Sequence, residues 1–118
     1  DLLAGTVFWE VADMDRTAES LARALADPEL RAEHPQQLLR WAEAEFTRKR
    51  FDAALPLYRE LEGVAGLADQ ARYRQGQILL ATGRRGEALK LFTDLAEKGE
   101  APQWRQAASG ALFAETPR

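Results

Sequence analysis

The side chains best suited to chemistry in this chain are one histidine and a pair of closely spaced aspartates. His34 precedes Pro35 in a predicted loop, where a catalytic base would still need a partner within hydrogen-bond reach. Asp13 and Asp15 have the spacing that opens a calcium loop, but Ala18 stands where that loop needs its central glycine. We therefore expect a solvated histidine at position 34, and a turn with a helix cap at Asp13 and Asp15.

Nucleophilic, metal and phosphate chemistry lack the residues that they require. The chain has no cysteine, which excludes disulfides, zinc–thiolate sites and cysteine nucleophiles. Neither a glycine-rich phosphate loop nor a nucleophile elbow is present. Glu43 and Glu45 fall on different faces of one predicted helix and make a poor acid–base pair. The sequence predicts a protein that is not an enzyme and uses neither a cofactor nor a metal.

Net charge and hydropathy exclude some classes of binding partner. The net charge of −3 argues against a nucleic-acid partner, because proteins that bind nucleic acids normally carry an excess of basic residues. The apolar runs are far shorter than the roughly 20 residues of a membrane span, so we expect no membrane insertion of this segment. The basic run Arg48 to Arg50, and the pair Arg84 and Arg85, fall in predicted turns. They are interpreted as solvated charge, with a small basic edge as the alternative.

The helices that would position a functional site recur along the chain at a fixed spacing. Ala42, Gly76 and Gly110 are spaced by 34 residues, and so are Ala54 and Ala88. The residues that follow the second pair also correspond: Leu55 with Leu89, Tyr58 with Phe92 and Leu61 with Leu95. Small residues let two helix backbones approach, and the large residues fill the space beside them, so this pattern predicts repeated helix pairs.

This 34-residue period resembles the tetratricopeptide repeat family, whose unit is two antiparallel helices. First helices would carry Trp41, Ala42 and Phe46, then Gln75, Gly76 and Leu80; second helices would carry Ala54, Tyr58 and Leu61, then Ala88, Phe92 and Leu95. A weaker earlier unit would use Leu2, Gly5 and Trp9, then Ala18, Ala22 and Leu25. Four positions depart from the family pattern: Gln75 replaces a large apolar residue, Glu45 replaces an aromatic one, and Leu61 and Leu95 stand where the family prefers alanine.

The resemblance implies an all-α fold, a right-handed tetratricopeptide-type α-solenoid of about three helix pairs plus one C-terminal helix from about Pro102 to Glu115. The expected units are 1–34, 35–68, 69–102 and the half-unit 103–118. Asp27-Pro28 and His34-Pro35 mark breaks between helices, and Gly63, Gly66, Gly83 and Gly99 fall at helix ends. Pro56 lies near the start of a predicted helix, where it should remove a backbone hydrogen bond or bend the helix.

In the tetratricopeptide family the first helix of each pair lines a concave groove that holds partner proteins. The positions that this implies for partner binding are Gln36, Leu39, Arg40, Glu43 and Phe46, then Gln70, Tyr73, Arg74, Gln77 and Leu80. Arg40 and Arg74 are equivalent positions, so we expect a short basic ladder. The alternative is that Phe46 and Leu80 only pack between helices and that both arginines are solvated.

The leading functional hypothesis is a scaffold that binds another protein. The sequence is similar to the periplasmic repeat regions of bacterial exopolysaccharide exporters, which implies a periplasmic location, a role in exopolysaccharide export and biofilm formation, and a polysaccharide-modifying enzyme as the partner. One alternative is a glycan-contacting surface that uses Tyr73 and Trp104, with Trp9 and Trp41 at packing positions. Another is a purely structural module whose repeats stack end to end. Because the first and last helices are apolar nearly all round, we expect that the chain is cut from a longer superhelix or that its end helices self-associate.

Overall fold

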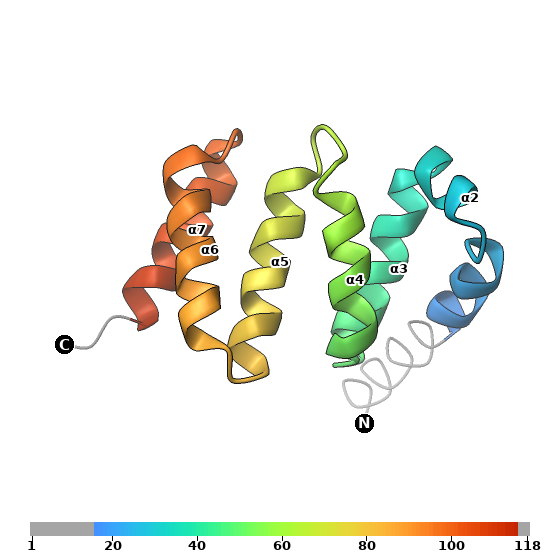
Figure 1. Ribbon diagram of the computed structural model, residues 1–118, viewed down its shortest axis with the longest axis horizontal. Helices are drawn as coiled ribbons and strands as arrows, with labels where there is room; N and C mark the ends of the chain where they lie inside the picture. Colours follow the sequence, from blue (N-terminus) through green and yellow to red (C-terminus); the bar gives the residue numbers. More distant parts are fainter. Residues whose placement is uncertain (1–15, 116–118) are drawn as a thin grey trace, which may run out of the picture. The chain divides into compact units, whose positions relative to one another are not determined.

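The structure is a computed structural model that describes residues 16–115, and every regular element in this range is helical (Figure 1). A helix covers residues 16–24. It is followed by α2 (Pro28–Glu33), α3 (Pro35–Thr47), α4 (Phe51–Leu61), α5 (Ala68–Ala81), α6 (Arg85–Lys98) and α7 (Pro102–Glu115). The prediction of an all-α fold is confirmed for these residues, and the last helix has the predicted bounds. The predictions for Leu2, Gly5, Trp9, Asp13 and Asp15 lie outside the described residues.

The chain divides into two compact units, Asp1–Leu57 and Tyr58–Arg118, and the division falls within α4. Each unit is described by itself. In the first, α2 and α3 are in contact. In the second, α6 contacts both α5 and α7, and α5 also contacts α7. Figure 1 shows α5, α6 and α7 as successive antiparallel helices joined by short connections.

Helix α2 is an element that the repeat pattern did not predict. The predicted breaks at Asp27-Pro28 and His34-Pro35 are correct, but a six-residue helix lies between them. The Asp27 side chain accepts a hydrogen bond from the Glu29 amide at 2.9 Å, and proline occupies the first turn. A capping aspartate followed by proline starts a helix as readily as it ends one, because proline has no amide hydrogen to leave unsatisfied there.

The same backbone turn ends α3 and α5. After α3, the Arg50 amide donates to the Glu45 carbonyl at 2.9 Å, and Lys49 has a left-handed φ of 62°. After α5, the Arg84 amide donates to the Leu79 carbonyl at 2.7 Å, and Gly83 has a φ of 84°. This is the Schellman motif, in which one left-handed residue lets two amides satisfy the last helix carbonyls. The turn therefore recurs at the 34-residue period.

The core of the second unit forms where α6 packs between α5 and α7. Its buried residues are Leu79, Ala88, Phe92, Leu95 and Ala108. Gly76 lies against the Phe92 ring so closely that a Cβ atom there would be 2.5 Å from two ring carbons. The predicted packing positions Ala42, Ala54, Tyr58, Leu61, Ala88, Phe92 and Leu95 are all fully buried. The structure thus confirms the small–large packing scheme at these positions, but not at Gly110, which is exposed and would have nothing within 4 Å of a Cβ atom.

Two further features affect individual helices, one at the start of α5 and one inside α4. Asp69, in the first turn of α5, accepts a hydrogen bond from the Ala101 amide at 2.7 Å, just before α7 begins. Pro56 lies inside α4 with its ring exposed, so the helix continues to Leu61 although Pro56 cannot donate to the Asp52 carbonyl. The predicted glycines Gly63, Gly66, Gly83 and Gly99 all lie in the connections between helices.

Candidate functional site: the partner-facing sides of α3 and α5

Helix α3 has two chemically distinct sides. Its buried residues are Leu38, Ala42, Ala44 and Glu45, mostly spaced by three or four residues. Among the predicted partner-facing residues, Gln36 and Arg40 are exposed, and Leu39, Glu43 and Phe46 are partly buried. The Phe46 ring packs edge-on against Phe51, with centroids 5.8 Å apart. A partner that approaches this side of α3 would therefore meet Gln36 and Arg40 first.

Arg40 lines an open hollow of about 230 Å³ in the first unit, which it shares with the helix at residues 16–24. The other lining residues are Arg16, Thr17, Ser20 and Leu21. Both arginines are exposed, and none of the described residues that line the hollow is acidic. Two guanidinium groups and two hydroxyl groups are all capable of donating hydrogen bonds, so the hollow suits an anionic group. Sequence reasoning found Arg40 but missed Arg16, because their juxtaposition depends on how two helices pack.

The corresponding side of α5 is less exposed. Gln70, Tyr73, Arg74 and Gln77 are all partly buried. Arg74 donates to the Gln77 Oε1 at 2.7 Å, one helical turn along the same side of the helix. Arg40 belongs to the first unit and Arg74 to the second, so the basic ladder that their 34-residue spacing implies stays a prediction.

Tyr73 belongs as much to the core as to the surface. Its ring lies 5.7 Å from that of Phe92 and 5.5 Å from that of Trp104, both measured between centroids. Tyr73, Leu80 and Trp104 all pack against the buried core of the second unit. Tilted aromatic pairs at these distances are favourable packing. Replacing Tyr73 would therefore disturb stability as well as any partner contact.

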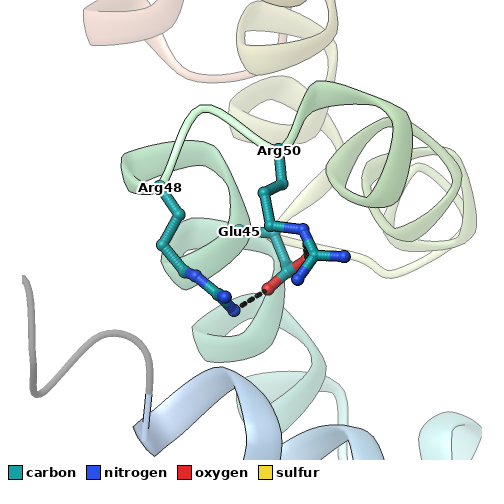
Figure 2. A network of polar contacts seen from close by, with 3 residues as sticks. All are labelled: Glu45, Arg48 and Arg50. Carbon is teal, nitrogen blue, oxygen red and sulfur yellow. Dashed lines mark hydrogen bonds and ion pairs between the residues drawn. The ribbon is translucent and has the colours of Figure 1, made fainter.

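The basic run that follows α3 has a structural role that the sequence did not reveal. Glu45 is buried, with 5% of its side chain exposed, and its Oε1 lies 2.8 Å from the Arg48 Nη1 (Figure 2). The Arg50 Nε is 3.7 Å from the other carboxylate oxygen. A buried carboxylate needs such partners because leaving water costs it hydration. The interpretation of this run as solvated charge is therefore wrong for Arg48, which is mostly buried, whereas Arg50 and Lys49 are exposed.

The remaining chemical candidates do not assemble into a reactive site. His34 is exposed, and its side chain makes no capping hydrogen bond at the start of α3. Within residues 16–115, no group of three or more histidine, cysteine or acidic side chains is placed to hold a metal ion. Gln75 is buried, and its Nε2 has no hydrogen-bond partner. No helix in the described part of the chain has both the length and the apolar character needed to cross a bilayer.

Comparison with known proteins gives no relative for this chain. Neither the family models, the curated proteins nor the solved structures contain a match.

Proposed function

We propose that this chain is a protein-interaction scaffold, a tetratricopeptide-type α-solenoid whose α3 and α5 hold a partner through their groove-facing side chains. The observation that carries the proposal is the hollow that Arg16 and Arg40 line together, in which no other described lining residue is charged. Arginine binds carboxylates with two parallel hydrogen bonds and is enriched among the residues that dominate protein interfaces. The partner segment at this hollow is therefore acidic.

The repeated packing supports a scaffold over a catalyst. Three pairs of residues 34 positions apart are fully buried in both members, namely Ala54 with Ala88, Tyr58 with Phe92 and Leu61 with Leu95, and the same turn ends both α3 and α5. Helix repeats that stack into a solenoid form extended surfaces, and partners bind along those surfaces. We extend the proposal to the setting that the sequence resemblance implies: a periplasmic assembly for exopolysaccharide modification and export, with a polysaccharide-modifying enzyme as the partner.

A capture experiment with charge-matched variants tests this function. The chain is immobilised, proteins from a bacterial envelope extract are captured and identified, and the affinity of the purified partner is then measured by calorimetry. Arg16→Glu/Arg40→Glu is compared with Arg23→Glu/Arg59→Glu, which makes the same charge change at exposed arginines outside the hollow. Tyr73 is left unchanged because it packs on the core.

The expected result is a loss of at least about tenfold in affinity for the first variant, which corresponds to about 1.4 kcal/mol. The control variant should lose much less, because charges outside a contact act mainly through long-range, salt-screened attraction. Equal losses in both variants would show that only net charge matters. No loss in either would place the partner's contact away from the hollow, and a chain that captures no partner would count against the scaffold itself.

A further inference from the structure

Helix α7 repeats the side of α5 that holds α6, but in α7 that side is exposed. On α5, Gly76 and Leu79 are both buried, and they pack against the Phe92 ring and the core around it. The residues 34 positions later are Gly110 and Phe113. Both are exposed, and Phe113 retains 75% of its accessible surface. Leu79, by contrast, retains 7%.

The space in front of Gly110 is empty. A Cβ atom at Gly76 would collide with Phe92, whereas a Cβ atom at Gly110 would have nothing within 4 Å. An open hollow of about 270 Å³, lined by Pro102, Arg105, Gln106 and Ser109, lies along the preceding turns of the same helix. We call the surface made by these four residues with Gly110 and Phe113 the open face of α7.

The inner side of α7 is already occupied. Ala108 is fully buried in the core, and Trp104, Ala111 and Leu112 pack against that core beside α6. The exposure of Gly110 and Phe113 is therefore not a sign that α7 is loosely attached. What marks this side is its correspondence with α5, where the equivalent residues Gly76 and Leu79 are buried. Burying Phe113 against a helix in the same way would be favourable.

We propose that the open face of α7 binds a partner helix that carries the packing pattern of α6: a small residue, an aromatic residue four positions later, and leucine three positions after that. In α6 these residues are Ala88, Phe92 and Leu95. The aromatic ring of the partner helix occupies the space in front of Gly110, as Phe92 occupies that in front of Gly76. The partner helix cannot be the α6 of a second copy of this chain, because α6 is packed between α5 and α7 of its own copy. The inference does not depend on the proposed groove.

The internal repeat provides a probe for this surface. Arg118 lies 34 residues after Arg84, so a copy of residues 85–98 appended directly after Arg118 keeps the register of the repeat. Attachment also makes the docking of this helix intramolecular, which removes most of the cost of bringing a separate helix to the surface. The control extension carries the Phe92→Asp change in its copy. Gly110→Leu is introduced both into the original chain and into the extended chain.

We expect the extension to add about one helix of the length of α6, which is 14 residues, as measured by circular dichroism. We also expect it to raise Tm by about 5 °C or more. The control extension should give neither effect. Gly110→Leu should leave the original chain unchanged or more stable, since leucine favours a helix more than glycine does, but it should abolish the gain in the extended chain.

Three results would overturn the proposal. The extension could add no helix, or its gain in Tm could persist in the Gly110→Leu background. Alternatively, sedimentation could show that the original chain forms a dimer that Phe113→Asp dissociates. This last result would make a second copy the occupant of the open face.

Discussion

Gly76 and Phe92 are in direct contact, and the glycine backbone forms part of the surface on which the aromatic ring rests. A Cβ atom at residue 76 would lie 2.5 Å from the Phe92 Cε1 and Cζ atoms, and Phe92 is fully buried. A glycine inside a helix usually lowers stability. Here it is needed because only glycine allows α5 and α6 to approach this closely.

The first prediction compares alanine at two equivalent glycines. Gly76→Ala should lower the free energy of unfolding, since overpacking of a core costs about 1–3 kcal/mol and the ring has no free space. Gly110→Ala should raise it by up to about 1 kcal/mol, because the site is open and alanine favours helix. Urea denaturation of both variants measures the contrast. Similar values for the two would mean that Phe92 moves aside freely.

A buried amide without a partner gives the second prediction. Gln75→Met preserves the approximate size of the side chain and removes a buried Nε2 donor that has no hydrogen-bond partner. The free energy of unfolding should rise by about 1 kcal/mol, since an unsatisfied buried polar group is costly. The control is Gln37→Met on the exposed side of α3, which should change stability by less than about 0.5 kcal/mol. A loss of stability in Gln75→Met would reveal an unrecognised partner of the amide.

The two Schellman turns give the third prediction. Lys49→Gly should stabilise the first unit by about 0.5–1 kcal/mol, because lysine is strained at a left-handed φ of 62° and glycine is not. Gly83→Ala should destabilise the second unit by a similar amount, of order 1 kcal/mol, for the same reason. Thermal unfolding of both variants provides the measurement. A destabilised Lys49→Gly variant would indicate that the lysine side chain itself supports the turn.

The fourth prediction separates the two arginines that face Glu45. Arg48→Ala should cost on the order of 3 kcal/mol, because it removes the close partner of a buried carboxylate. Arg50→Ala should cost about 1 kcal/mol or less, since that side chain is 54% exposed and its contact is longer. The double variant Glu45→Leu/Arg48→Ala should recover much of the loss, because it removes the unpaired charge. Chemical denaturation measures the free energy of unfolding of all three variants. Equal losses in the two single variants would contradict the prediction.

The repeat spacing was sufficient to predict the helices α3 to α7, but not α2, because the packing of helices in pairs depends on small and large residues at a fixed period. Ala42, Gly76, Ala54 and Ala88 are buried where the period places them. The spacing did not predict that Glu45 is buried, because the burial of this carboxylate depends on the hydrogen bond that Arg48 donates to it. Arg16 was missed for a similar reason. Its position beside Arg40 depends on the packing of two helices, and neither helix alone specifies it.

The hydrogen bond between Asp69 and the Ala101 amide has a consequence for how the second unit unfolds. It joins residues 32 positions apart, so it connects the start of one first helix to the start of the next. In repeat proteins each unit contacts mainly its neighbours, and partly opened states with one end unfolded are therefore accessible. Because the Asp69 side chain bonds to a residue almost one repeat later, the unfolding of α7 is linked to that of α5. Frayed intermediates should consequently be scarce in this unit, and its amide hydrogens should exchange together.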